Sequence, residues 1–159
     1  MKKIIQVFDR SVNWVLTILV IALLAAMTVI VLAQVIFRFF RASIIWSEEI
    51  SIYMMVWCTF LGAALCCRKG TMIGLDALRS ILPAPARKVV LVLSAVLIVV
   101  FLGTLSVVGF RIAGQMWSQT TPILKLPMGF VYSAIPVGAI LMAVNTVISS
   151  VESMEVSET

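Results

Sequence analysis

Four long stretches of the chain are almost entirely apolar, and the charged residues are confined to the segments around them. An α-helix needs roughly 20 apolar residues to cross a bilayer. Unbroken apolar runs favour helices over a membrane β-barrel, whose strands alternate in polarity. The pattern predicts an all-α integral membrane protein that forms a single membrane domain over residues 1–159. The four expected transmembrane helices are at about 11–38, 48–68, 87–111 and 128–150.

The segment between the second and third stretches has a different pattern. Leucines recur at helical spacing and charged side chains lie on another face, which predicts a short amphipathic helix at about 71–82 on the cytoplasmic membrane surface. Gly70 precedes it and Pro83 follows it, as at helix boundaries. The residues that define the two faces are Leu75, Asp76, Leu78, Arg79 and Leu82. An ordinary connector with incidental periodicity is the alternative.

Composition supports the membrane class and removes several kinds of chemistry. Of the 159 residues, 62% are hydrophobic and 12% are charged, and the mean hydropathy is +1.16. A soluble domain is typically about 25% charged. The chain has no histidine, and its three cysteines lack the paired spacing of a metal site. We therefore expect no catalytic residue, cofactor or metal ion. The net charge of +5 comes from basic residues that flank apolar segments, which indicates orientation in the lipid bilayer and no nucleic-acid partner.

The distribution of basic residues predicts the orientation. Eight lie before the first stretch or between the second and third, whereas four lie on the other side. Because basic residues concentrate on the cytoplasmic side, both termini are expected in the cytoplasm. The first apolar stretch is also far longer than the 7–15-residue core of a secretory signal, so we expect it to remain as a span.

A charged cluster separates the first and second stretches. Ser47 is expected to cap the second helix, which places Glu48 and Glu49 in its first turn, where the helix dipole favours carboxylates. Arg38 and Arg41 are close enough in sequence to pair with these carboxylates. The cluster is either an interfacial ion-pair girdle or a docking site for another protein chain. Its residues are Arg38, Arg41, Trp46, Ser47, Glu48 and Glu49.

The middle of each predicted span carries no Asp, Glu, Lys or Arg. The polar residues there are mild, such as Thr28, Thr59 and Ser106. Carriers of ions normally keep an ionisable residue or a broken helix at this depth. Small residues recur four apart, for example Gly109 with Ala113 and Ala134 with Gly138, and such pairs let helices approach closely in lipid. The chain is better suited to packing than to carrying a solute by itself.

Short motifs follow one another over residues 5–150 in an order that resembles one family, the small membrane subunit (DctQ- or SiaQ-like) of tripartite ATP-independent periplasmic (TRAP) transporters. The motifs are Phe37-Arg38-Phe39, Trp46-Ser47-Glu48-Glu49, Phe60-Leu61-Gly62-Ala63-Ala64, Arg68-Lys69-Gly70, Ile73-Gly74-Leu75-Asp76, Leu126-Pro127-Met128-Gly129 and Ile135-Pro136-Val137-Gly138. Two positions depart from the family pattern. Met72 stands where His is frequent, and Lys125 adds a positive charge where small or apolar residues are usual.

The resemblance implies a function and two protein partners. Such a subunit works in the bacterial inner membrane with a large multi-span membrane subunit and a periplasmic substrate-binding protein. Uptake of an organic acid, such as a four-carbon dicarboxylate or a sialic acid, is driven by an ion gradient, usually sodium. The small subunit would brace the large one and help to dock the binding protein. Lys125 then joins Arg38, Arg41, Trp46, Glu48 and Glu49 as a candidate docking residue.

Two other functions are considered. A stand-alone four-helix transporter would be expected to keep a carboxylate within its first span, and this span has none. A membrane-anchor subunit of a redox enzyme would need a buried histidine, a metal set or a carboxylate cluster, and only Glu48 and Glu49 are present.

Overall fold

The computed structural model describes residues 2–40, 44–68 and 84–156. Its elements are α1 (Lys2–Phe39), α2 (Ile45–Arg68), α4 (Ala84–Gln115), the 3₁₀ turn η1 (Met116–Ser118), α5 (Met128–Tyr132) and α6 (Ala134–Val156). Four helical segments are long and apolar enough to cross a membrane, which confirms the predicted all-α fold with four spans. The amphipathic helix expected at about 71–82, with Leu75, Asp76, Leu78, Arg79 and Leu82, lies outside the described residues.

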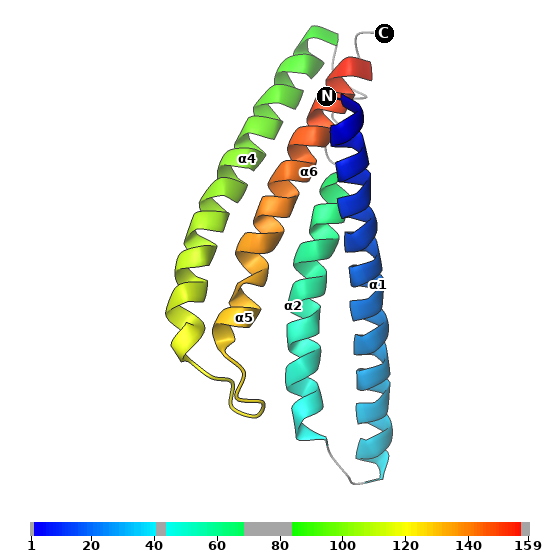
Figure 1. Ribbon diagram of the computed structural model, residues 1–159, viewed down its shortest axis with the longest axis vertical. Helices are drawn as coiled ribbons and strands as arrows, with labels where there is room; N and C mark the ends of the chain where they lie inside the picture. The colour runs from blue at the N-terminus through cyan, green and yellow to red at the C-terminus, as the bar shows by residue number, and fades with distance from the viewer. Residues whose placement is uncertain (1, 41–43, 69–83, 157–159) are drawn as a thin grey trace.

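The long helices are arranged in a row. Extensive contacts join α4 to α6, α6 to α2, and α2 to α1. Figure 1 shows this order, seen down the shortest axis of the molecule. We call this arrangement the helix row. Its inner helix α6 has 33% of its most apolar window buried, whereas the edge helix α1 has 6%. The two faces of the row therefore remain open to lipid or to another protein.

The helix row has two distinct ends (Figure 1). Both chain termini lie at one end, which we call the terminal end. The C-terminus of α1, the N-terminus of α2 and the loop between η1 and α5 lie at the other, which we call the loop end. Segments far apart in sequence therefore meet at the loop end.

Glycines allow α6 to lie close to both of its neighbours. A Cβ atom at Gly138 of α6 would lie 2.6 Å from Cβ of Phe60 in α2. A Cβ atom at Gly109 of α4 would lie 2.9 Å from Cδ of Pro136 in α6. Ala134, one turn before Gly138, has no exposed surface. Two of the small-residue pairs in the sequence, Gly109 with Ala113 and Ala134 with Gly138, thus pack within the helix row.

The fourth span is broken near its start. The helix is interrupted at Ser133, which separates α5 from α6. Pro136 follows three residues later and has no backbone N–H to donate to the preceding turn. The Ser133 hydroxyl donates to the carbonyl oxygen of Phe130 at 2.6 Å, and Val137 N–H donates to Ser133 at 3.2 Å. The proline break lets α5 lead into the loop end at its own angle.

Candidate functional site

A buried carboxylate organises the loop end. Glu49 lies in the first turns of α2, and its side chain is buried. Its Oε1 accepts a hydrogen bond from the Tyr53 hydroxyl at 2.5 Å, and its Oε2 accepts one from the backbone N–H of Leu124 at 2.9 Å. A buried carboxylate is stable only when donors satisfy both oxygens. Glu49 therefore ties α2 to the loop that precedes α5.

The loop held by Glu49 is itself a compact turn. Thr121 N–H donates to the Leu126 carbonyl at 2.9 Å, and Leu126 N–H donates to the Thr121 hydroxyl oxygen at 3.0 Å. Thr121 is 1% exposed. Between them Lys125 adopts a positive φ of 53°, a conformation that few residues other than glycine take up. The turn therefore has a fixed shape, and the exposed Lys125 side chain is presented at the loop end.

The start of α2 differs from the prediction. The helix begins at Ile45, so Ser47 lies inside its first turn and is not the N-cap. The Ser47 hydroxyl donates to the Ile44 carbonyl oxygen at 2.7 Å, where a cap would accept from a backbone N–H. Because Ser47 is 1% exposed, it packs inside the loop end.

The candidate docking residues gather at this end, but they are not alike. Arg38, Glu48 and Lys125 are exposed, and the ring of Trp46 is also exposed. Glu49 is buried and bonded to Tyr53 and Leu124, so its carboxylate has other partners than the expected arginines. Arg41 lies outside the described residues. The exposed members carry charges of both signs.

A second polar contact links three helices inside the membrane region. The Asn145 amide of α6 donates to the Asn13 side-chain oxygen of α1 at 3.1 Å and to the Ala64 carbonyl oxygen of α2 at 2.7 Å. Asn145 is 3% exposed. These bonds fix the relative positions of α1, α2 and α6 toward the terminal end.

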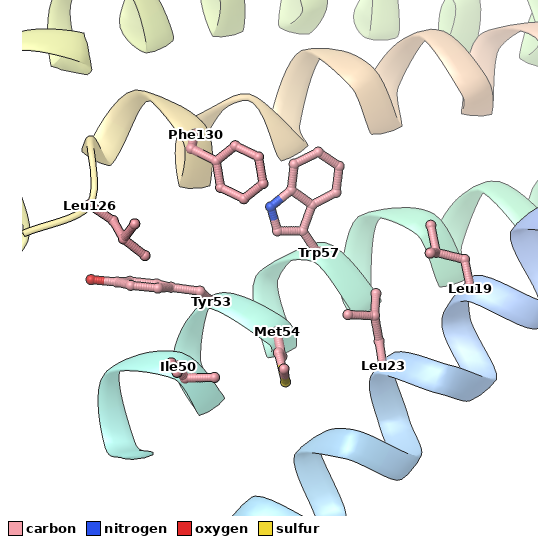
Figure 2. A pocket seen from close by; sticks show the side chains of 8 residues that line it. All are labelled: Leu19, Leu23, Ile50, Tyr53, Met54, Trp57, Leu126 and Phe130. Atoms are coloured by element: carbon pink, nitrogen blue, oxygen red, sulfur yellow. The ribbon is translucent and has the colours of Figure 1, made fainter. Parts of the chain in front are cut away.

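An apolar groove is lined by residues of α1, α2 and α5 and of the loop that precedes α5. Its floor is a stripe of α2 at helical spacing, and its walls are two residues of α1 and two from the loop and α5 (Figure 2). The ring centroids of Trp57 in α2 and Phe130 in α5 lie 5.6 Å apart. The groove has a volume of about 340 Å³. Its lining residues are Leu19, Leu23, Ile50, Tyr53, Met54, Trp57, Leu126 and Phe130.

None of these features resembles a catalytic or metal centre. Among the described residues, no group of three or more His, Cys, Asp or Glu side chains is positioned to hold a metal ion. The three cysteines form no disulfide, and Glu49 is occupied by structural hydrogen bonds.

Comparison with known proteins identifies the family. Residues 27–155 match the DctQ component of tripartite ATP-independent periplasmic transporters. The chain belongs to this family. It is 31% identical over 134 residues to a TRAP transporter small permease protein of Haemophilus influenzae, covering 83% of each chain. A C4-dicarboxylate TRAP transporter small permease protein of Rhodobacter capsulatus is 36% identical over 102 residues, which are 63% of this chain and 45% of the relative. A protein of that name from Vibrio cholerae is 27% identical over 144 residues, 75% of this chain and 62% of the relative.

As a DctQ-family chain, the protein is a component of a transporter and not an enzyme. Its four candidate spans and its family make it a multi-pass protein of the inner membrane. The chain covers less than two thirds of the length of the two C4-dicarboxylate relatives.

The sequence gives no indication that Leu124 and Thr121 hold the loop before α5 in place. Leu124 acts through its backbone N–H, which any residue except proline supplies. Thr121 is one of many threonines in the chain, and only its burial and its bond to Leu126 set it apart. The buried Asn145 does have a signal, because an amide within an apolar run needs a partner in lipid.

Proposed function

We propose that this chain is the small permease subunit of a TRAP-type secondary transporter, which braces a large multi-span membrane subunit. One observation carries the proposal. No Asp, Glu, Lys or Arg occurs between Ser11 and Phe37, Ile50 and Cys67, or Val89 and Phe110. A chain without charge at membrane depth lacks the groups with which carriers bind ions and anionic solutes. The transport path then belongs to the large subunit.

The helix row is suited to bracing. Its inner helices are fixed to each other by close glycine contacts and by the Asn145 bonds, so the row resists bending as a unit. Both faces expose large apolar side chains over most of their length. Clamped to a fixed part of the large subunit, such a row widens the hydrophobic footprint and opposes tilting in the bilayer.

The loop end is proposed as the periplasmic side, with both termini in the cytoplasm. In the sequence, eight basic residues precede the first span or lie between the second and third, and four lie in the other two intervals between spans, which supports this orientation. The exposed Arg38, Trp46, Glu48 and Lys125 would then help to receive a periplasmic substrate-binding protein. Arg41 belongs to the same proposed surface by its place in the sequence, and Glu49 would hold the loop that presents Lys125.

The transported solute is proposed to be a four-carbon dicarboxylate, because two of the similar proteins are named for C4-dicarboxylate transport. A sialic acid is the other organic acid that we consider. We propose that a sodium gradient drives the uptake. Sodium dependence is tested by replacing external Na⁺ with K⁺ in an uptake assay.

The experiment is reconstitution with and without the large subunit. The two membrane subunits are co-expressed, purified together in mild detergent and placed in proteoliposomes with the binding protein. We expect co-purification, and uptake of labelled dicarboxylate only when all three proteins are present. Uptake by vesicles that contain this chain alone would refute the bracing role and favour a stand-alone carrier.

A further inference from the structure

The groove between α1 and α5 has a regular construction. Its floor residues Ile50, Tyr53, Met54 and Trp57 occupy positions i, i+3, i+4 and i+7 of one face of α2. Leu19 and Leu23, four residues apart, form the α1 wall, and Leu126 and Phe130 form the opposite wall (Figure 2). The α2 part of the lining extends over seven residue steps, about 10 Å along the helix axis. The groove is therefore elongated, and its long direction runs along the helix axes.

The lining has the chemistry of hydrocarbon. The Tyr53 hydroxyl donates to Glu49, so the ring of Tyr53 is the part that lines the floor. The indole nitrogen of Trp57 is buried and has no hydrogen-bond partner among the residues that the structure describes. An apolar cavity of roughly 150 Å³ already takes up a benzene-sized ligand. The groove, at about 340 Å³, has room for a longer hydrocarbon segment. Both α1 and α2 are candidate membrane spans, so lipid chains can reach the groove wherever another protein does not cover it.

The charge at the loop end matches a phospholipid. Lys125 is exposed and directly precedes Leu126, the groove residue nearest the loop tip. Its positive φ is part of the turn fixed by Thr121 and Glu49, so the backbone of Lys125 has a fixed position one residue before the groove residue Leu126. The negative charge of Glu49 is shared by two hydrogen bonds and turned toward the loop. A cation beside an apolar groove favours an anionic group attached to a hydrocarbon chain.

We propose that this groove binds one acyl chain of a phospholipid, whose phosphate lies at Lys125. The site is distinct from the path of the transported solute. It gives the edge helix α1 a fixed lipid neighbour along α2, where the helix row has little buried surface of its own. The inference rests on the geometry of the groove and holds whichever solute the transporter carries.

The test is photolabelling of the complete transporter complex in vesicles. The vesicles contain a phospholipid with a diazirine in the middle of one acyl chain, and labelled peptides are identified by mass spectrometry. Leu23→Trp fills the groove from the α1 wall. Ile18→Trp is its control, because Ile18 lies on the same helix, is exposed and does not line the groove. We expect labelling of the segment 50–57 in the native complex, its loss in Leu23→Trp and its retention in Ile18→Trp.

The headgroup contact is tested separately. Lys125→Gln is expected to lower labelling of the groove about fivefold, the effect of one lysine near a lipid phosphate. The control is Arg111→Gln, another exposed cation, which lies near the end of α4 outside the groove. Co-purification with the large subunit shows that each variant folds.

Three results would overturn the proposal. One is labelling of segment 50–57 that Leu23→Trp and Ile18→Trp change equally. Another is equal labelling of the Lys125→Gln and Arg111→Gln complexes. The third is the absence of a lipid adduct on segment 50–57 of the native complex, as expected if the large subunit covers the groove. Uptake activity, measured in parallel, reports on the bracing role independently.

Discussion

The backbone N–H of Leu124 donates to the Glu49 carboxylate at 2.9 Å across 75 residues of sequence. This bond joins the first turns of α2 to the loop before α5. With the Tyr53 hydroxyl on the other oxygen, it satisfies a carboxylate that is 7% exposed. In the sequence Glu49 looks like part of a surface cluster, but in the structure it is buried and links α2 to the loop before α5.

Removing the Glu49 carboxylate should loosen the loop. In Glu49→Ala the Leu124 N–H and the Tyr53 hydroxyl lose their acceptor, and an unsatisfied buried donor costs about 1–3 kcal/mol. We expect a lower thermal unfolding midpoint and faster hydrogen exchange at Leu124 and Lys125. Glu48→Ala is the control, because Glu48 is the exposed neighbour, and it should change the midpoint little. Equal midpoints for the two variants would contradict this role of Glu49.

Replacing Asn145 should weaken the link between three helices. Asn145→Leu removes the bonds to Asn13 and to the Ala64 carbonyl. Hydrogen bonds between membrane helices contribute about 0.6 kcal/mol on average, with a maximum near 1.7. We expect a loss of stability in this range, measured by unfolding in mixed micelles. Asn13→Leu should cost less, since Asn145 then keeps its bond to Ala64.

The coupling between the two asparagines can be measured in a double-mutant cycle. The Asn13→Leu and Asn145→Leu changes should be less than additive, because the second removes a contact already lost in the first. Thr28→Val is a neutral control, since the Thr28 hydroxyl donates only within its own helix. Strict additivity would show that the amide pair does not form in the membrane.

The close approach of α2 and α6 should not tolerate a side chain at Gly138. A Cβ there would lie 2.6 Å from Cβ of Phe60, so Gly138→Ala forces the helices apart and should cost about 1–3 kcal/mol. Gly103→Ala is the matched control, because its Cβ would meet nothing within 4 Å and alanine favours the helix. Adding Phe60→Ala should relieve little of this cost, because alanine keeps the Cβ atom that makes the 2.6 Å contact. If both alanine variants were equally stable, the contact would not exist.

The sequence predicts the four spans well because each is a long uncharged run, and membrane depth leaves a helix as the available structure. It does not predict the helix row. A helix that is apolar all round gives no indication of which face is inside, since lipid and protein interior are equally apolar. The small residues Gly109 and Gly138 are the local hint, yet Ala22 has the same pattern with Ala26 and is exposed.

The loop end was harder to predict than the spans. The sequence predicts Trp46, Glu48 and Lys125 at one membrane interface, and in the structure these residues are exposed at the loop end. The sequence suggests the nearby arginines as partners of Glu49. In the structure one partner is the backbone N–H of Leu124, 75 positions away. The positive φ of Lys125 likewise follows from the turn between Thr121 and Leu126. A lysine at this position does not indicate a positive φ in the sequence, as a glycine would.

The proposed orientation makes Lys125 reachable from outside the cell. In a chain whose three native cysteines are replaced, Lys125→Cys should react with a membrane-impermeant maleimide added to intact cells, because this side chain is exposed at the loop end. Lys2→Cys, near the opposite end, should react only after the membrane is opened. The excess of eight basic residues over four favours this single orientation, so labelling of Lys125→Cys should clearly exceed that of Lys2→Cys in intact cells. Labelling in the reverse order would invert the proposed topology, and would remove the loop end from the side on which a periplasmic protein can dock.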